Sequence, residues 1–552
     1  MGGPRRSFSH LRPVPRVESR GEPRLAVLLP LSEQVPGRFI AESVARTLRA
    51  ETGASVLLIH LQRAPARVSL ADSSGLEPRL NGEFVFGRSV EETEPGVSEI
   101  RVQAGDGLNE PAAAGSLIRH ALQHFSHVLV HPGTATPLPV LLECCRLAGR
   151  LFLLLEASPA DLAQHDLLRG ELRRHPELAG LPVRALVCRP AGDEAARAFL
   201  RSPEGGAFEL LPDGPTPAAA EGLRHWPEPH FKAGIRRLAR EIARRRVGIA
   251  LSSGGARGLA HIGVIQVLEE NGIEVDYIAG CSMGSYVGAV WAAGFDGLAM
   301  ERFAREVEHR WGLLELIDPY LLPRRGFLRG EKTRRRLERT IGDVHFAELP
   351  RPLRIVATRL HSLERVVFSA GNVAEAVQAS SAIPGACVPV DLRGEFYIDG
   401  GVADPLPVDV LEELGVERII AVNTIPPAAF LRAYLDQERE RTARLGRRGN
   451  PLKMFLHRNL NYFAPGNILD TILRSFNGAQ MRVAEYSSLC ADLVLRPLSY
   501  DGRWHDFRRP GKYIAIGRRE AEEHLDEIKA LVHRRDPIHE PPIAHHALVQ
   551  AS

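Results

Sequence analysis

Two short turns in the middle of the chain carry the residue types of an acyl-transfer site. Residues 252–258 read SSGGARG, and residues 280–284 read GCSMG. Glycine lets backbone N–H groups come close to an anion, and the positive end of a following helix strengthens that contact. A serine between two glycines on a sharp turn is presented as a nucleophile. The two turns therefore predict an oxyanion hole and a nucleophile, the two parts of a serine hydrolase.

Apolar segments before both turns, and helical patterns after them, indicate how the turns are held. Val247–Leu251 precedes the first turn, and residues 275–279 precede the second. Successive strand–turn–helix units are typical of a parallel sheet, in which the carboxyl ends of neighbouring strands meet at one edge. A later apolar strand, Glu395–Asp399, ends in a carboxylate that two glycines follow. The sequence thus predicts a serine, a carboxylate and a glycine-rich turn at strand ends.

These positions receive distinct predicted roles. Ser282 attacks an acyl carbon, and Asp399 accepts its proton. Backbone N–H groups of Gly254, Gly255 and Ala256 hold the oxyanion, and removal of one such donor typically costs about 10²–10³ in rate. The supporting positions of the three turns are Arg257, Gly258, Gly280, Gly284, Gly400 and Gly401.

The order of these motifs resembles that of the patatin-like phospholipases. The glycine-rich turn, GCSMG, ASSAIPG at residues 379–385 and DGG at residues 399–401 follow one another as they do in that family. The resemblance covers about residues 244–423. It implies a Ser–Asp dyad at Ser282 and Asp399, a three-layer α/β/α core with a mostly parallel sheet, and hydrolysis of lipid acyl esters.

The upstream segment LAVLLPLSEQVPGRFIAESVARTL is also similar to the region that precedes the catalytic domain of neuropathy-target-esterase-like lysophospholipases, whose bacterial branch this chain resembles. One position departs from the family pattern. Ser253 stands where the oxyanion motif usually has the first of three glycines. If the turn requires a left-handed φ at that position, a serine costs roughly 1 kcal/mol or more.

The chain is expected to divide into several segments. Apolar strands alternate with amphipathic helices through residues 25–192, which predicts a smaller α/β domain to which the sequence assigns no role. Residues 64–109 within it are acidic and are predicted to form a loop. The expected division is a disordered N-terminus at 1–24, the N-terminal α/β domain at 25–192, a linker and basic helix at 193–243, the patatin-like catalytic domain at 244–425, a helical part completing it at 426–535, and a tail at 536–552.

The composition and the motifs limit which partners and cofactors we expect. A formal net charge of +3 over 552 residues provides no global field for nucleic acid. The N-terminal domain contains neither GxxxxGK[ST] nor GxGxxG after its first strand, and the six cysteines show no metal-ligand spacing. We therefore expect a phospholipid or lysophospholipid substrate, with no nucleic acid, no metal and no cofactor. No oligomeric state follows from the sequence.

The sequence also carries expectations about membranes. No segment reaches the roughly 18 consecutive apolar residues of a membrane span, and the first 24 residues lack the apolar core of a secretory signal. We expect a cytoplasmic protein that contacts the inner face of the membrane peripherally. The basic helix at residues 232–246 is expected to present a solvated face, which could also meet anionic headgroups.

Three alternatives to a Ser–Asp lipid hydrolase stay open. One is a Ser-His-Asp esterase of the α/β-hydrolase type, with His457 or His505 as its third member, because both follow the serine and the aspartate in chain order. Another is a lipid- or ligand-binding regulatory protein whose dyad is weakened by Ser253. A third is an acyltransferase, since an alcohol can resolve the same acyl-enzyme. His261 and Cys281 are expected to be structural.

Overall fold

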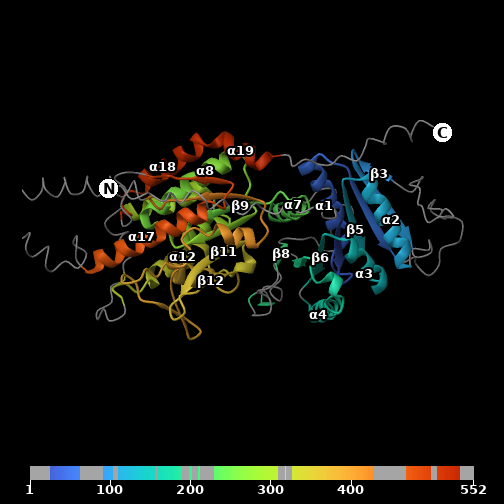
Figure 1. Cartoon of the computed structure of the whole chain (residues 1–552), viewed down its shortest axis with the longest axis horizontal. Helices are drawn as coiled ribbons and strands as arrows, with labels where there is room; N and C mark the ends of the chain where they lie inside the picture. The colour runs from blue at the N-terminus through green and yellow to red at the C-terminus, as the bar shows by residue number, and fades with distance from the viewer. Residues whose placement is uncertain are drawn as a thin grey trace, which may run out of the picture.

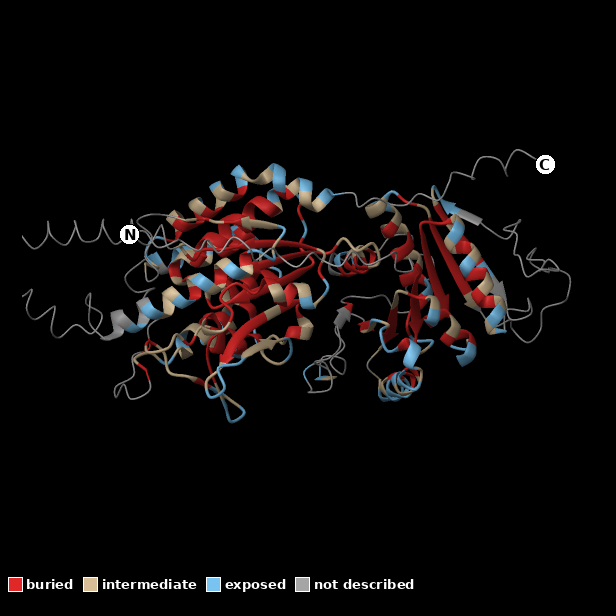
Figure 2. Cartoon of the chain, viewed as in Figure 1, coloured by how far each residue is buried: buried red, intermediate tan, exposed pale blue. Residues whose placement is uncertain are grey.

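The computed structural model describes residues 25–62, 91–103, 110–156, 158–188, 198–199, 201, 209–211, 229–308, 318, 326–427, 468–498 and 506–534. Within these ranges the chain forms two sheets, each covered by helices on both faces (Figure 1). The buried residues follow the strands and the inner faces of the helices (Figure 2). The expected N-terminal disorder at 1–24 and the tail at 536–552 lie outside the described residues, as do His457 and His505.

The N-terminal sheet has the strand order β3-β4-β2-β5-β1-β6-β7-β8 and is parallel except for β3 against β4. Helices α1 and α7 bury their apolar sides against one face, and α2, α3 and α4 cover the other. The elements are β1 (Leu25–Pro30), α1 (Gly37–Thr52), β2 (Val56–Gln62), β3 (Glu91–Glu94), β4 (Val97–Gln103), α2 (Pro111–His124), β5 (His127–Pro132), α3 (Leu138–Leu147), β6 (Arg150–Leu155), α4 (Pro159–Arg173), η1 (Pro176–Leu178), β7 (Val183–Cys188), β8 (Glu209–Leu211) and α7 (Pro229–Ile242).

The second sheet has the order β13-β14-β11-β10-β9-β15-β16, and β12 also pairs with β11. The adjacent strands β11, β10, β9, β15 and β16 are parallel to one another, whereas β12, β13 and β14 make antiparallel pairs. Its strands are β9 (Val247–Leu251), β10 (Tyr277–Cys281), β11 (Leu353–Arg359), β12 (Arg365–Phe368), β13 (Val390–Leu392), β14 (Glu395–Asp399), β15 (Arg418–Val422) and β16 (Leu493–Leu495).

Helices cover both faces of this second sheet. Apolar residues of α8, α9, α13 and α18 form the core on one face, and those of α14 and α17 contribute to the core on the other. This arrangement is the predicted three-layer α/β/α fold with a mostly parallel sheet. The helices are η3 (Gly255–Leu259), α8 (Ala260–Glu270), α9 (Met283–Ala292), α10 (Gly297–Arg305), η4 (Glu306–Glu308), α12 (Glu331–Ile341), η5 (Phe346–Glu348), α13 (Val373–Ser380), η6 (Gly400–Val402), α14 (Val408–Glu413), α17 (Ile468–Ser488), α18 (Pro510–Glu523) and α19 (Leu525–His533).

Three segments have more structure than the sequence predicted. β3 and β4 lie within the acidic stretch that was expected to be a loop, and β8 lies within the expected linker. Helix α7, the expected basic helix, packs against α1 and joins the N-terminal layer. No helix of the described residues is both long enough and apolar enough to cross a membrane.

Some charged residues of α7 are paired within the chain, although Lys232 is exposed and the Arg236 side chain is 40% exposed. Arg240 contacts Glu51 of α1 (Nε to Oε2, 3.0 Å) and Asp276 just before β10 (3.4 Å). Glu241 is buried and pairs with Arg150 at 3.0 Å and also with Arg184. The charges of Arg240 and Glu241 are therefore matched within the chain.

Candidate active site

Ser282 sits on a strained elbow between β10 and α9. Its backbone has φ 52° and ψ −117°, in the left-handed half of the map that non-glycine residues rarely occupy. Such a residue costs about 1–3 kcal/mol, and the surrounding structure must impose it. A Cβ at Gly284 would lie 2.2 Å from the carbonyl oxygen of Leu251, and one at Gly280 would lie 2.6 Å from that of Gly284. Both glycines of GCSMG are therefore required for the elbow to close.

Asp399 meets Ser282 directly. Ser282 Oγ donates a hydrogen bond of 2.7 Å to Asp399 Oδ2, and the N–H of Gly401 donates one of 2.7 Å to Oδ1. The two residues come together because β10 and β14 flank the same strand, β11. Thr358 of β11 also donates its hydroxyl to the carbonyl of Asp399 (3.1 Å). The predicted serine and carboxylate are thus adjacent and jointly fixed.

Burial controls the protonation of Asp399. The side chain is 1% exposed, and this loss of hydration raises its pKa from 3.8 to about 6. The hydrogen bonds from Ser282 and Gly401 oppose the rise because they stabilise the charged form. The carboxylate is therefore ionised at neutral pH and is a stronger base than an exposed aspartate.

Ser380, at the end of α13, holds the elbow by hydrogen bonds. Its Oγ accepts the backbone N–H of Ser282 (2.8 Å) and donates to the carbonyl of Val356 in β11 (2.6 Å). This serine belongs to the ASSAIPG motif, for which the sequence suggested no individual role. Because the N–H of Ser282 is already paired, it is not free to bind an oxyanion.

The glycine-rich turn lies beside the elbow. Gly255 has φ 57°, and a Cβ at Gly258 would lie 2.5 Å from Met283 Cγ, so η3 packs against the residue after Ser282. The first N–H groups of a helix have no partner within it. Among the described residues, none accepts a hydrogen bond from the N–H of Gly254, Gly255 or Ala256. These three groups are available to an oxyanion.

Ser253 fits this turn without strain. It is absent from the non-glycine residues with positive φ among those described, so the cost considered from the sequence does not arise. Its N–H donates to the carbonyl of Pro405 (2.8 Å), and its Oγ accepts from Gln480 Nε2 of α17 (3.3 Å). Gln480 is buried and also lies against Gly401, where an added Cβ would be 1.9 Å from Nε2. Helix α17, far along the chain, therefore joins the glycine-rich turn to the Asp-Gly-Gly turn.

His261, Cys281 and Arg257 are neighbours of the dyad. His261 Nε2 donates to the carbonyl of Ser252 (2.9 Å), and burial lowers its pKa to about 4, so it is a neutral structural residue. Burial raises the pKa of Cys281 well above its ordinary value, which keeps it a thiol. Arg257 lies half-buried within η3. Gly400 begins η6, where an added Cβ would meet the carbonyl of Val356.

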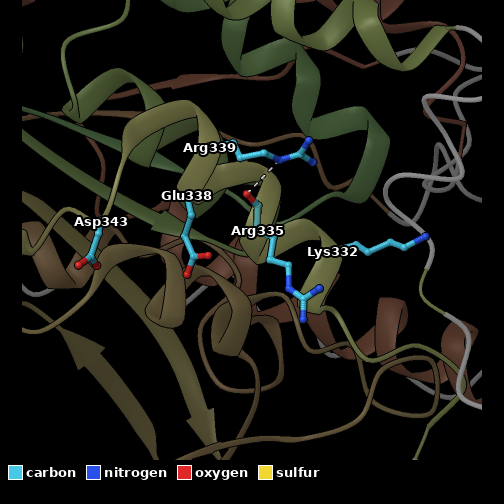
Figure 3. Close-up of a pocket in the computed structure, with 5 residues that line it drawn as sticks. All are labelled: Lys332, Arg335, Glu338, Arg339 and Asp343. Carbon is cyan, nitrogen blue, oxygen red and sulfur yellow. Dashed lines mark hydrogen bonds between the residues drawn. The ribbon is translucent and has the colours of Figure 1, made fainter.

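A separate surface hollow lies on α12, which packs on α13 and α9 (Figure 3). Its volume is about 910 Å³. Charges of both signs line it, and neither Ser282 nor Asp399 does, so it is distinct from the dyad. The lining residues are Lys332, Arg335, Glu338, Arg339 and Asp343.

Comparison with known proteins places a family domain over this site. Residues 249–412 match the family model described as patatin-like phospholipase. An uncharacterised NTE family protein of Mycobacterium tuberculosis is 42% identical over 179 residues, covering 32% of this chain and 49% of the relative. Lysophospholipase nte1 of Aspergillus fumigatus is 35% identical over 198 residues, covering 35% of this chain and 13% of that protein. This chain thus spans about half the length of the mycobacterial relative and much less of the fungal one.

Alignments with solved structures are weaker. VipD from Legionella pneumophila aligns over 51% of this chain and 67% of its own, with 14% identity and a TM-score of 0.26.

Proposed function

We propose that this chain, whose residues 249–412 form a patatin-like phospholipase domain of the NTE type, hydrolyses the acyl ester of a lysophospholipid or phospholipid. One observation carries the proposal: Ser282, on a strained elbow, donates a 2.7 Å hydrogen bond to the buried carboxylate of Asp399. A hydroxyl in this arrangement is aligned to lose its proton as it attacks. Contact with a membrane or micelle surface belongs to the same proposal, because the substrate resides there.

The reaction follows from these contacts. Ser282 Oγ forms a bond to the carbonyl carbon while its proton passes to Asp399 Oδ2. The carbonyl oxygen becomes an oxyanion, which the N–H groups of Gly254, Gly255 and Ala256 bind. Collapse breaks the ester bond, and the departing glycerol oxygen takes the proton from Asp399. Water then attacks the acyl-enzyme, Asp399 again takes and returns a proton, and the fatty acid leaves as Ser282 is regenerated.

The electrostatics of the site favour direct proton transfer from Ser282 to Asp399. A carboxylate is a weak base for a hydroxyl, but the raised pKa of Asp399, about 6, narrows the gap between the pKa of the carboxyl and that of the serine hydroxyl. The oxyanion donors lower the remaining activation free energy, and they act in a site where Ser282 and Asp399 are both buried. The positive end of α8 lies behind the glycine-rich turn and favours the same negative charge.

The direct contact favours a dyad over a Ser-His-Asp triad. In a triad an imidazole stands between the hydroxyl and the carboxylate. Here the two side chains are 2.7 Å apart, which leaves no room for a ring between them. His261, the histidine nearest in sequence to the elbow among those described, instead donates to the carbonyl of Ser252. Likewise, the relaxed backbone of Ser253 removes the reason to expect a weakened site.

Fatty-acid release tests the proposal. Lysophosphatidylcholine, phosphatidylcholine and p-nitrophenyl butyrate are offered separately to wild type, Ser282→Ala and the control Ser369→Ala, which removes an exposed serine beyond β12. We expect wild type and the control to hydrolyse a phospholipid ester equally, and Ser282→Ala to lose about 10⁴-fold or more. Hydrolysis of the short ester alone would overturn the substrate class. Activity that survives Ser282→Ala would overturn the mechanism, and transfer of the acyl group to added alcohol in preference to water would identify an acyltransferase.

A further inference from the structure

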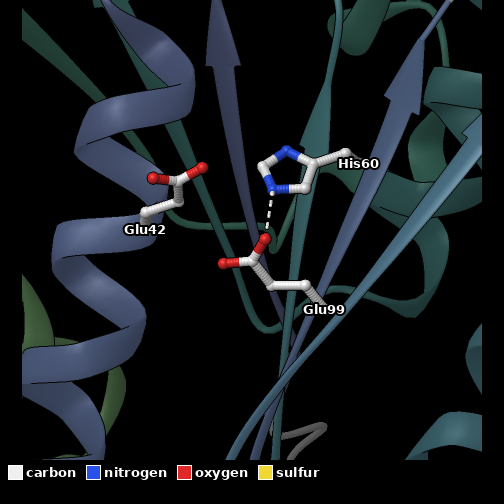
Figure 4. A group of neighbouring side chains, drawn as sticks. All are labelled: Glu42, His60 and Glu99. Carbon is white, nitrogen blue, oxygen red and sulfur yellow. Dashed lines mark ion pairs between the residues drawn. The ribbon is translucent and has the colours of Figure 1, made fainter. Parts of the chain in front are cut away.

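Three side chains that the proposed hydrolysis does not use face one another in the N-terminal domain. Glu42 comes from α1, His60 from β2 and Glu99 from β4 (Figure 4). Each offers one ligand atom, and these atoms all lie within 4.8 Å of one another. His60 and Glu99 are buried, and Glu42 is half-buried. Such a group lies well away from the Ser282–Asp399 dyad, on the other sheet.

The register of the sheet brings these residues to one face. Leu58 of β2 is the partner of Glu99 in β4, and His60 is the partner of both Arg101 in β4 and His131 in β5. Because side chains alternate along a strand, His60 and Leu58 point to the same side, where Leu58 packs in the apolar core beneath α1. Buried carboxylates and imidazoles in such a layer are costly unless they are paired or coordinate a metal.

His60 has the geometry of a ligand, because its Nε2 faces the two carboxylates without a hydrogen-bond partner. Its Nε2 is buried and has no hydrogen-bond partner, and it stands 3.9 Å from Glu99 Oε2. That separation is too long for a hydrogen bond. Two atoms that each bind one ion at about 2.0–2.2 Å stand roughly 3–4 Å apart, so the gap fits a shared cation. On the other side of the ring, Nδ1 lies 3.2 Å from His131 Nδ1, which fixes its orientation.

Two arginines lie beside the carboxylates of this cluster. Arg38 binds Glu42 (Nε to Oε1, 2.7 Å), and Arg101 stands 3.7 Å from Glu99. These arginines offset part of the negative charge of the two carboxylates, and Arg101 Nη2 approaches Oε2 of Glu99, the oxygen that lies 3.9 Å from His60 Nε2.

We infer that Glu42, His60 and Glu99 bind one divalent transition-metal ion of the Zn²⁺ class, and that His131 orients His60 for this role. An imidazole with two carboxylates favours such ions over Mg²⁺ or Ca²⁺, which prefer oxygen ligands alone. A histidine ligand usually has its second ring nitrogen engaged; with the ion on Nε2, His60 Nδ1 carries the proton and can donate it to His131 Nδ1, 3.2 Å away. Three protein ligands leave at least one position for water. The ion ties α1 to β2 and β4.

Metal uptake by the full chain tests this inference. Protein stripped with EDTA is incubated with excess Zn²⁺, passed through a desalting column and analysed for bound zinc. The variants are Glu99→Gln and the matched control Glu94→Gln, an exposed glutamate of β3. Histidines at 539, 545 and 546 and the six cysteines are common to all three proteins, so the difference between them reports this site. We expect wild type and Glu94→Gln to hold one more zinc per chain than Glu99→Gln.

Thermal unfolding provides the second readout, with opposite signs in the two conditions. Without metal, Glu99→Gln should unfold at a higher temperature than wild type, because a neutral amide replaces a buried carboxylate. With Zn²⁺, wild type should gain stability and Glu99→Gln should not. Replacement of His131 by Asn should weaken zinc binding about 10–100-fold. Equal zinc uptake and equal stabilisation in wild type and Glu99→Gln would overturn the inference; should that variant fail to fold, equal uptake by the half-buried Glu42→Gln would do the same.

Discussion

Replacement of Asp399 by asparagine should abolish activity and at the same time stabilise the fold. Asparagine keeps the shape of the side chain, so its Oδ1 can accept the N–H of Gly401 and its amide can donate to Ser282 Oγ. It cannot take a proton from Ser282, so turnover should stop. It also removes a carboxylate that is 1% exposed, whose charge the fold must hold away from water.

The size and pH dependence of the stabilisation follow from the pKa. A rise from 3.8 to about 6 corresponds to about 3 kcal/mol, at about 1.4 kcal/mol per unit. Above pH 6 the folded protein holds the ionised carboxylate and bears this cost in full. Between pH 6 and pH 4 the folded state binds a proton that the unfolded state releases, so wild-type stability increases as the pH falls. The advantage of Asp399→Asn should therefore be about 2–3 kcal/mol at pH 8 and close to zero at pH 4.

Urea unfolding of wild type and Asp399→Asn across this pH range measures the difference, with a circular-dichroism readout. Asp526→Asn, at an exposed position in the first turn of α19, serves as the control and should stay within about 0.5 kcal/mol of wild type at every pH. An Asp399→Asn variant less stable than wild type at pH 8, or a difference that does not change with pH, would refute the reasoning about this buried carboxylate.

Three further predictions concern the same site. The kcat/KM for ester hydrolysis should be half-maximal near pH 6 and fall about tenfold per unit below pH 5, because Asp399 must be ionised; a pH–rate profile that is flat from 5 to 8 would contradict this. Gly284→Ala should abolish activity and lower the unfolding temperature, since the new Cβ would lie 2.2 Å from the carbonyl of Leu251, and wild-type kinetics would disprove the close approach. Gln480→Ala should lower kcat more than it changes KM, because Ser253 and Gly401 lose a shared contact, whereas Ser253→Gly should stay within about threefold of wild type; equal losses in both variants would contradict this division.

The catalytic core was the more predictable part of the chain because its chemistry depends on local sequence. The glycines at 280 and 284 flank a serine after an apolar strand, and backbone crowding at that elbow leaves no alternative residue. The parallel strands β9 and β10 end at one edge of the sheet, which places the glycine-rich turn beside Ser282. Asp399 ends β14, which runs antiparallel to β11, so the rule for parallel strand ends does not explain its position. The contact between Ser282 and Asp399 followed from topology, with β11 lying between their two strands.

Contacts made across long sequence distances were not predictable in this way. Gln480 reaches the glycine-rich turn from a helix more than two hundred residues later, and no spacing rule links the two. The arginines of α7 were predicted to form a solvated basic face, yet Arg240 pairs with Glu51 of α1 and with Asp276 just before β10. Residues 91–103 were predicted to be part of an acidic loop, but they form β3 and β4, with the turn at Pro95-Gly96. The acidic residues concealed the strands, because Glu99 points inward only through the pairing of β4 with β2.

The same reason explains why a metal cluster was not expected from the sequence. Its residues, Glu42, His60 and Glu99, come from three separate elements and share no fixed spacing of the kind that marks zinc motifs. Only the register between β2 and β4, with α1 laid across them, brings the ligand atoms together.

The most direct test of the central claim is to identify the residue that reacts as the nucleophile. A fluorophosphonate–biotin probe forms a bond from its phosphorus to a nucleophilic serine Oγ and releases fluoride, and peptide mass mapping then locates the adduct. The account predicts a single adduct on Ser282, absent in Ser282→Ala and formed much more slowly in Asp399→Asn, where the carboxylate that accepts the proton is missing. An adduct on a different residue with Ser282 unmodified, or an unchanged labelling rate in Asp399→Asn, would contradict it.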